Sequence, residues 1–285
     1  MRVVITGCKG QLGRQLTAAF AGHELVGLDL PEDDITNPAI SERIAGFAPD
    51  LLLHAAAYTD VDGCERDPDL AFRANAVGTQ NVALAAQRAR AALLYISTNE
   101  VFDGTRRDLY REWDQPNPIS VYARSKAAGE QIVRDLLDRF YIVRIAWLFG
   151  PGGANFVTKI LAGAEKNSVL RVAADEFGNP TYAPDLADAI ATLVATGQYG
   201  IYHLTNAGFC SRFEFAREIM RLAGKPDLPI TPILSAEWPR PSQPPLHAVL
   251  ANTNALALGI TLRPWREALA EYLRTERVQV ERVQV

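Results

Sequence analysis

The start of the chain places three regularly spaced glycines directly after a short apolar run. Residues 3–5 read Val-Val-Ile, and Gly7, Gly10 and Gly13 follow in a G-x-x-G-x-x-G spacing. Glycine has no Cβ, so the backbone can turn sharply here and approach a phosphate, which the positive end of a following helix attracts. The spacing therefore predicts a strand, a phosphate-binding turn and a helix that begins near Gln11.

Short apolar runs alternate with longer amphipathic segments up to about residue 147. Unbroken apolar strands between such helices are typical of a parallel sheet covered on both faces, and right-handed crossovers then give a doubly wound fold. We therefore predict an α/β fold with a doubly wound, Rossmann-like parallel sheet. The expected strands are 3–6, 25–29, 51–54, 93–97 and 142–146, and the expected helices are 11–22, 38–47, 68–90 and 119–139.

After the glycine-rich residues 150–153 the alternation gives way to shorter elements and a Pro-rich passage, with a closing helix near 264–274. This change predicts a smaller, mixed C-terminal lobe. We predict a dinucleotide-binding domain of residues 1–150, which residues 183–205 also join. The substrate lobe is predicted to consist of residues 151–182 and 206–275. Residues 276–285 form a predicted terminal extension. The extension repeats a five-residue unit and carries no predicted catalytic group.

Charge and cysteine content exclude several function classes. The net charge is −4, the pI is about 5.7 and no Lys/Arg cluster stands out, so a nucleic-acid partner is not expected. Cys8, Cys64 and Cys210 are widely spaced, which argues against a disulfide framework or a zinc site and favours a reducing cytoplasm. No apolar run reaches membrane-spanning length and no signal peptide is recognised, so we expect a cytoplasmic protein without a membrane partner.

An acidic residue, Asp29, ends the second predicted strand, where a carboxylate can accept hydrogen bonds from the adenosine ribose and repel a 2′-phosphate. Lys9 inside the turn opposes this preference, so the expected cofactor is NADH or NADPH, with NADH slightly favoured. A structural turn without a ligand, and a carboxylate that only caps a strand, are the alternatives. The cofactor-binding candidates from these segments are Gly7, Lys9, Gly10, Gln11, Leu12, Gly13, Asp29, Asp34 and Ile35, of which the last two would hold adenine or be plain loop residues.

Tyr122 and Lys126 lie one helical turn apart on the same face of a predicted helix. A free tyrosine has a pKa near 10, and a neighbouring ammonium group is expected to favour its phenolate, while also holding the nicotinamide ribose. Thr98, just after a predicted strand, is placed to hydrogen-bond a substrate oxygen at the carboxyl edge of the sheet. Together these residues predict hydride transfer at a carbon that bears oxygen. His54 is expected to be a buried, hydrogen-bonded residue.

Taken together, these segments resemble the extended short-chain dehydrogenase/reductase family, and within it the dTDP-4-dehydrorhamnose reductases. The motifs that carry the resemblance are the glycine turn and residues 54–62, 75–79, 97–104, 122–126, 146–150, 155–156, 178–181 and 240–241. The resemblance implies NAD(P)H-dependent reduction of the 4-keto group of a nucleotide-linked 6-deoxyhexose, most simply dTDP-4-dehydro-L-rhamnose to dTDP-L-rhamnose. It implies cofactor contacts at Ala55, Ala56 and Asn75, catalysis by Thr98, Tyr122 and Lys126, and sugar-nucleotide contacts at Val61, Trp147, Asn155 and Arg240.

Two of these substrate contacts are also open to plainer interpretations. Trp147 follows a strand and can pack on a sugar or base, but it can equally be a core tryptophan. Arg240 can bind a pyrophosphate through two parallel hydrogen bonds, or be an exposed loop residue.

The chain departs from the family pattern after Thr98. Related reductases read Ser-Thr-Asp-Tyr-Val-Phe and the similar 4,6-dehydratases Ser-Thr-Asp-Glu-Val-Tyr, whereas residues 97–102 here read Ser-Thr-Asn-Glu-Val-Phe. An amide at Asn99 cannot supply the acid that dehydration needs, so dehydration is disfavoured, while Asn99 and Glu100 are expected to line the substrate pocket. Gln15 replaces a glutamate that binds magnesium in some relatives, so no metal is expected.

Two other functions stay open at this point. One is a sugar-nucleotide epimerase or dehydratase that keeps and recycles its cofactor. The other is a non-catalytic regulatory subunit similar to the methionine adenosyltransferase β subunit, which has comparable motifs. A nucleotide-sugar substrate is the expected partner, and a homodimer is an option that the sequence leaves open.

Overall fold

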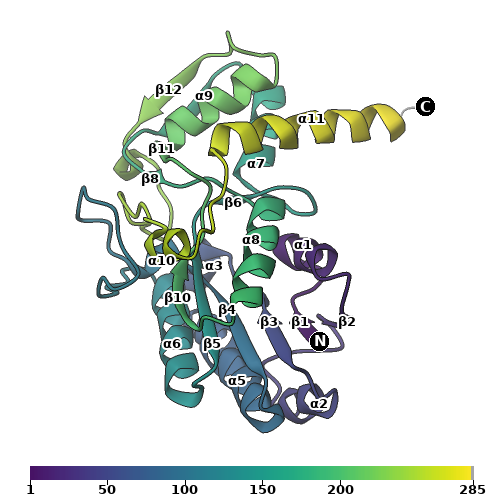
Figure 1. The fold of residues 1–285 in the computed structure, drawn as a ribbon. Helices are drawn as coiled ribbons and strands as arrows, with labels where there is room; N and C mark the ends of the chain where they lie inside the picture. The colour runs from purple at the N-terminus through teal and green to yellow at the C-terminus, as the bar shows by residue number, and fades with distance from the viewer. Residues whose placement is uncertain (284–285) are drawn as a thin grey trace.

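The computed structural model describes residues 1–283, and its main feature is a sheet of six parallel strands (Figure 1). The strands lie in the order β10-β5-β4-β3-β1-β2. Their bounds are β1 Arg2–Thr6, β2 Glu24–Leu28, β3 Leu51–His54, β4 Ala92–Thr98, β5 Phe140–Ile145 and β10 Gly200–His203. The predicted doubly wound α/β fold is confirmed, and the five predicted strands occur within two residues of their expected ends.

The strand order reverses at β1, which pairs with β2 on one side and with β3 on the other. The carboxyl ends of β1 and β3 therefore face a crevice at a topological switch point, where open α/β sheets bind their ligands. The backbone N–H of Ala55, just past β3, donates to the Thr6 carbonyl at 3.1 Å. This pairing places the glycine turn beside the alanines that follow β3.

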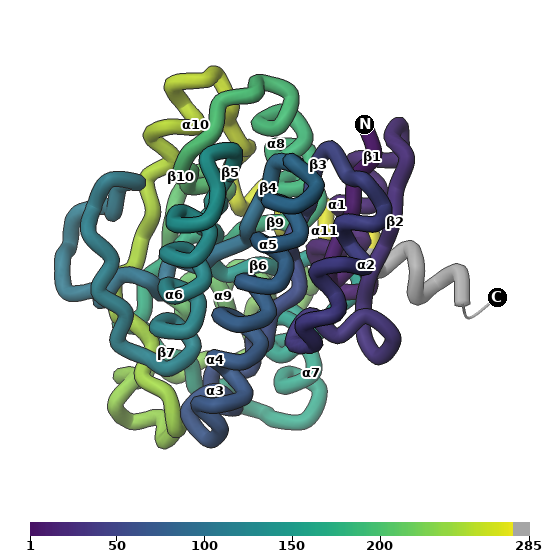
Figure 2. Tube along the Cα trace, turned by 90° about the horizontal axis from the view of Figure 1, so that it is seen from below, coloured from purple at the N-terminus to yellow at the C-terminus, as the bar shows by residue number. Residues whose placement is uncertain are grey.

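Helices cover both faces of the sheet because each crossover carries one. The buried leucines of α1 (Gln11–Ala19) and α8 (Ala183–Thr196) pack in one apolar cluster. On the opposite face α2 (Ile40–Gly46), α5 (Gly78–Ala89) and α6 (Val121–Leu136) lie side by side (Figure 2). Lys126 and Tyr122 belong to the first turns of α6, so the sheet fixes their position.

The single helix predicted over 68–90 is divided into three consecutive segments. These are α4 (Pro68–Phe72), a π-helical turn η1 (Arg73–Val77) and α5. A short helix, α3 (Val61–Arg66), precedes them and was not predicted. Aspartates cap the N-termini of α3 and α4. Asp60 accepts a hydrogen bond from Gly63 N, and Asp67 accepts one from Leu70 N.

The remaining elements form a smaller lobe that Figure 1 shows at the far end of the molecule from α2 and α5. Its core is aromatic and includes Phe149, Phe215, Trp265 and Tyr272. Its elements are β6 Leu148–Phe149, α7 Phe156–Lys166, β7 Leu170–Ala173, β8 Phe177–Gly178, β9 Thr181–Tyr182, β11 Cys210–Ser211, α9 Arg212–Leu222, β12 Ile230–Ile233, η3 Ser235–Glu237 and α11 Trp265–Val283. The short helix α10 Thr253–Ala257 is not part of the lobe.

Two parts of the C-terminal region differ from the predicted pattern. Residues around α10 pack on the main sheet through Ala255, Ile260 and Leu262 rather than on the lobe. The closing helix α11 continues past the expected end at 274 to Val283, so the repeated extension begins as helix. The last two residues of that extension, 284–285, lie outside the described residues.

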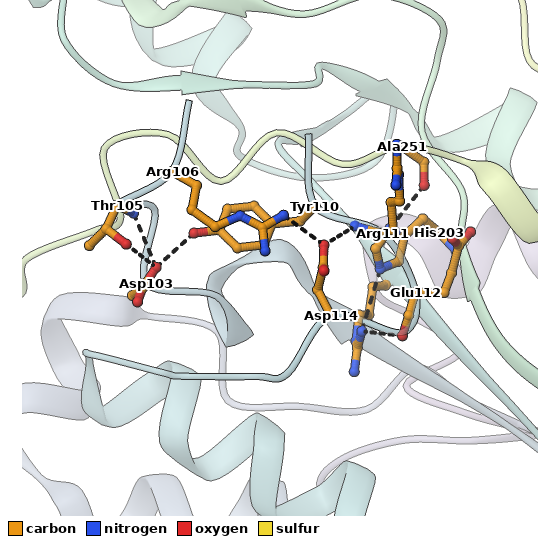
Figure 3. A network of polar contacts seen from close by, with 10 residues as sticks. Asp103, Thr105, Arg106, Tyr110, Arg111, Glu112, Asp114, His203 and Ala251 are labelled. Atoms are coloured by element: carbon orange, nitrogen blue, oxygen red, sulfur yellow. Dashed lines mark hydrogen bonds and ion pairs between the residues drawn. The ribbon is translucent and has the colours of Figure 1, made fainter. Parts of the chain in front are cut away.

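The connection between β4 and α6 is held by polar side chains (Figure 3). The Asp103 carboxylate accepts hydrogen bonds from Thr105 and from the Tyr110 hydroxyl, at 2.9 and 2.7 Å. These hydrogen bonds hold the pKa of Asp103 well below its usual value. Asp114 accepts from the Arg106 guanidinium at 3.0 Å. The network fixes the long segment whose two ends carry Thr98 and Tyr122.

Within residues 1–283 we find no helix that combines the length and the apolar character needed to cross a membrane.

Candidate functional site

The glycine turn is shaped for close approach of a phosphate. Gly7 has φ of +72°, and a Cβ there would lie 2.6 Å from Ala56 N. A Cβ on Gly13 would collide with the Gly7 carbonyl, so α1 packs tightly on the turn. Gly10 is the N-cap of α1 and has no side chain to accept from the first helical N–H groups, which are left for an anion. These features fit the pyrophosphate of a dinucleotide.

A cavity of about 560 Å³ extends from the turn along the ends of β2 and β3. Seven of the predicted cofactor residues line it, namely Gly7, Gly10, Asp29, Asp34, Ile35, Ala55 and Ala56. Asp29 also supports the turn, because its carboxylate accepts from the backbone N–H groups of Lys9 and Leu30 at 2.7 and 2.8 Å. The Lys9 ammonium donates to the Leu30 carbonyl at 3.0 Å and lies 3.7 Å from the Glu32 carboxylate.

The Asn75 side chain is hydrogen-bonded within the protein. Its side chain is buried, donates to Tyr58 O at 3.0 Å and Ser125 Oγ at 2.9 Å, and accepts from Tyr58 N at 2.8 Å. The amide group thus uses its hydrogen-bonding capacity to join the loop after β3 to α6. The cofactor contact that the resemblance implies for Asn75 stays a prediction.

A second cavity, of about 570 Å³, adjoins the first and brings the predicted catalytic residues together. Gly7, Gly10, Ala55 and Ala57 line both cavities. The predicted residues that line the second one are Gly7, Gly10, Gln11, Leu12, Gly13, Ala55, Val61, Thr98, Asn99, Glu100, Tyr122, Lys126 and Trp147. Thr98 comes from the end of β4, whereas Tyr122 and Lys126 come from α6, whose N-cap Ser120 accepts from Ala123 N. The glycine turn and the tyrosine–lysine pair therefore face one space.

Tyr122 is held in its protonated form. Burial raises the pKa of its phenol well above the ordinary value and the Glu100 carboxylate raises it further, while a hydrogen bond with Thr98 opposes these effects. Burial and Glu100 thus favour the neutral phenol, and the expected contribution of Lys126 to the phenolate stays a prediction. A phenol that keeps its proton at neutral pH is suited to donate it to a carbonyl oxygen.

Lys126 is buried, and its ammonium group lies 4.1 Å from the centroid of the Tyr95 ring. Burial lowers the pKa of Lys126 to about 7, and the nearby Glu130 carboxylate opposes this shift. Glu130 itself accepts from Arg144 through both oxygens, at 2.8 and 2.7 Å, and from the Ser97 hydroxyl at 2.5 Å. Lys126 therefore interacts with a carboxylate that already accepts three other hydrogen bonds.

Sequence reasoning missed Glu130, although its spacing carried a signal. Tyr122, Lys126 and Glu130 follow one another at intervals of four residues, which places them on one helix face. Arg212 was also missed, and no local motif marks it. Its guanidinium lies 3.7 Å from the centroid of the Trp147 ring, and it lines the second cavity.

A third cavity, of about 560 Å³, adjoins the second at Trp147, Leu148 and Arg212. Trp147 is half-buried with φ of +43°, so it is neither a simple core residue nor an exposed one. Arg240 reaches this cavity and its Nε lies 3.1 Å from Asp62 Oδ1, which ties the Pro-rich passage to α3. The cavity is therefore lined by several aromatic side chains and by three arginines, Arg171, Arg212 and Arg240.

Asn155 lines the third cavity but uses its side chain locally. Its Oδ1 accepts from Val157 N and Thr158 N, and its Nδ2 donates to Gly150 O, at 3.0, 3.2 and 3.0 Å. It forms a capping box at the start of α7. Its predicted substrate contact would have to compete with these hydrogen bonds.

His54 is buried as expected, and its ring nitrogens lie 2.7 Å from Thr6 Oγ1 and 3.1 Å from Thr79 Oγ1. Burial lowers its pKa to about 3. The prediction of a hydrogen-bonded interior histidine is confirmed. In the described part of the chain, no three His, Cys, Asp or Glu side chains are grouped so that they could hold a metal ion.

Comparison with known proteins gives one consistent result. The family model of the RmlD substrate binding domain matches residues 1–278. A dTDP-4-dehydrorhamnose reductase of Mycobacterium tuberculosis is 40% identical over 281 residues, covering 95% of this chain and 92% of the relative.

Two solved structures agree in fold along nearly the whole chain. A dTDP-4-dehydrorhamnose reductase of Clostridium acetobutylicum has a TM-score of 0.93 and 38% identity, covering 97% of this chain and 100% of that one. The Bacillus anthracis enzyme of the same name, in complex with NADP, has a TM-score of 0.90 and 37% identity, covering 96% and 99%.

Proposed function

The chain belongs to the family of the RmlD substrate binding domain, and we propose that it reduces the 4-keto group of dTDP-4-dehydro-L-rhamnose with NADH or NADPH. One observation carries the proposal. Thr98, Tyr122 and Lys126 line the same cavity as the glycine turn, although they come from separate parts of the chain. A site built this way can hold a dinucleotide and a carbonyl compound side by side.

Each residue has a distinct part in the proposed reaction. When bound, the reduced nicotinamide supplies the hydride that adds to C4 of the sugar. Tyr122 gives its proton to the C4 oxygen, which becomes the hydroxyl of the product, and its raised pKa keeps that proton available at neutral pH. Thr98, which contacts Tyr122, hydrogen-bonds the same oxygen. Lys126 holds the nicotinamide ribose.

We place the nucleotide part of the substrate in the third cavity. The half-buried Trp147, whose ring lies against the Arg212 guanidinium, is the proposed contact for a base or sugar. Arg212 and Arg240 supply positive charge for the two phosphates. Because Trp147 and Arg212 also line the catalytic cavity, one extended molecule can reach from the third cavity to Tyr122.

We propose a slight preference for NADH over NADPH. Asp29 lines the first cavity and its negative charge would repel a 2′-phosphate. Lys9 and Arg73 oppose this preference, since Arg73 also lines the cavity. The Bacillus anthracis relative binds NADP, so the balance of these charges in this chain has to be measured.

We also propose that the protein works in the cytoplasm, in keeping with its three free cysteines. Light scattering would test whether the protein forms a homodimer.

The decisive experiment follows the oxidation of NADH and NADPH in the presence of enzymatically prepared dTDP-4-dehydro-L-rhamnose. We expect stoichiometric consumption of the reduced cofactor and formation of dTDP-L-rhamnose. Cofactor that stays bound without net turnover would indicate an epimerase or dehydratase instead. Absence of turnover together with co-purification of a synthetase would indicate a regulatory subunit.

A further inference from the structure

Glu100 is a half-buried acid that the proposed reduction does not use. It lies in η2 (Asn99–Val101), directly after the strand that carries Thr98, and its backbone N–H donates to Thr98 Oγ1 at 3.2 Å. It lines the catalytic cavity with Thr98 and Tyr122. Its Oε2 is buried and has no hydrogen-bond partner among the described residues. A buried carboxyl oxygen without a partner is costly unless a ligand or a proton satisfies it.

The chemistry of a 4-keto sugar gives this acid something to act on. A ketone makes the hydrogens on its two neighbouring carbons acidic, because the electron pair left by a departing proton moves into an enolate. Thr98 and Tyr122 are the groups that would hydrogen-bond the enolate oxygen, just as they would bind the ketone oxygen during reduction. The cavity therefore contains both parts that enolisation needs, an oxyanion-binding pair and a carboxyl group with one unpartnered oxygen.

We propose that Glu100 is a general base that removes and returns a proton on a carbon next to the keto group of the bound sugar. The proposal rests on the proposed function, because it needs a keto sugar in the same cavity. The C–H bond breaks, its proton passes to the Glu100 carboxylate, and its electron pair forms the carbon–carbon double bond of the enolate. Reversal restores the ketone, so the step requires no oxidant or reductant.

The surroundings of Glu100 agree with this role. Burial raises the pKa of its carboxyl to about 7, with a further contribution from Glu176, while Arg212, Arg240 and a hydrogen bond to Ser120 oppose the rise. Tyr122 and Cys64 are the other titratable groups that interact with it, and both keep their protons at neutral pH. A base with a pKa near the working pH is the most effective kind for proton abstraction.

Elimination does not compete with this exchange. The side chain of Asn99 is an amide and cannot protonate a leaving group, and a 6-deoxy sugar has no hydroxyl at C6 to lose. An enolate formed by loss of the C5 proton therefore has no neighbouring leaving group and can only be protonated again. Protonation by Glu100 from the same face exchanges the hydrogen with solvent and leaves the configuration of the carbon unchanged.

The test measures hydrogen exchange in deuterated buffer. The full-length protein is incubated with oxidised NAD and dTDP-4-dehydro-L-rhamnose freed from the enzymes that made it, so that no reduction occurs. Mass spectrometry follows the gain of one deuterium, and proton NMR identifies the carbon. We expect exchange above an enzyme-free blank, with a rate that rises as pH increases through about 7, because the carboxylate is the base.

Two variants assign the exchange to Glu100. Glu100→Gln keeps the size of the side chain but cannot take a proton, and it should lower the exchange rate by about 10²-fold or more. Glu112→Gln is the matched control, since Glu112 also has a buried, unpartnered Oε2 but lies in the network of Figure 3, outside the three cavities. It should leave exchange unchanged.

Four results would overturn the proposal. Wild-type exchange no faster than the blank, alongside normal oxidation of NADH, would remove the exchange activity but leave the reductase assignment intact. Exchange that persists in Glu100→Gln would place the base elsewhere. Equal losses of exchange and reduction in that variant would mean that the substitution only misplaces the sugar. Absence of both activities in the wild type would overturn the proposed function as well.

Discussion

The ammonium nitrogen of Lys126 lies 4.1 Å from the centroid of the Tyr95 ring, in the interior beneath the proposed site. An ammonium group loses hydration there, and an aromatic ring returns only part of the lost stabilisation. The lowered pKa of Lys126, about 7, expresses this cost. The protein therefore keeps a destabilising charge at the place where the proposed cofactor binds, which is typical of functional sites.

This relationship predicts that Lys126→Met makes the cofactor-free protein more stable while abolishing reduction. Below pH 7 the native protein carries a buried charge, and removing it should raise the free energy of unfolding by about 1–2 kcal/mol. The lysine has a higher pKa in the unfolded chain than in the folded protein. The wild type therefore gains stability as pH rises from about 7 toward 10, and the difference in free energy of unfolding between wild type and variant disappears. Urea unfolding at pH 6 and pH 10 measures this. A variant less stable than the wild type at pH 6 would contradict it.

Tyr122→Phe should lower the rate of reduction by about 10²–10⁴-fold, since it removes the proposed proton donor. Dinucleotide affinity, measured by fluorescence titration, should change little because the phenol acts on the sugar carbonyl. Tyr199→Phe is a suitable control, because Tyr199 is exposed and bonds Arg139 away from the site. Near-normal turnover by Tyr122→Phe would remove this residue from the mechanism.

Local rules predicted the elements of the site better than the environment of its side chains. Hydrophobic periodicity, helical spacing and turn chemistry predicted the strands, the glycine turn and the shared helix face of Tyr122 and Lys126. The structure has the glycine turn and these two residues lining one cavity. The raised pKa of Tyr122 depends on burial and on Glu100, and the position of Arg212 over Trp147 depends on how a distant helix packs. Such long-range contacts leave no periodic signal in a single sequence.

Asp29→Asn tests the charge that is proposed to favour NADH. The amide oxygen can still accept a hydrogen bond from Lys9 N or Leu30 N, so the turn should survive, but the repulsion of a 2′-phosphate is removed. The ratio of kcat/KM for NADPH to that for NADH should rise about tenfold, the scale of one charge interaction near a protein surface. Lys9→Ala should move the ratio in the opposite direction. A wild type that already prefers NADPH strongly would show that Lys9 and Arg73 dominate.

Asn99 offers the sharpest distinction between a reductase and a dehydratase. Its Nδ2 donates to the Ala248 carbonyl at 2.9 Å, which fixes the amide beside Thr98 with no acidic proton to give. We therefore expect no conversion of dTDP-glucose to its 4-keto-6-deoxy product in the presence of NAD, whereas a ready-made 4-keto sugar is reduced. Chromatography of the nucleotide sugars after prolonged incubation measures both reactions.

The Asn99→Asp variant completes this test, because it restores a carboxyl group beside Glu100 without lengthening the side chain. It should acquire a slow elimination of water from dTDP-glucose, with Glu100 as the base that removes the proton next to the transient ketone. Elimination by the variant alone would identify the residue at position 99 as the missing acid. Elimination at a useful rate by the wild-type protein would contradict the reductase assignment. It would show that protonation of the departing hydroxyl does not need a carboxyl group at position 99.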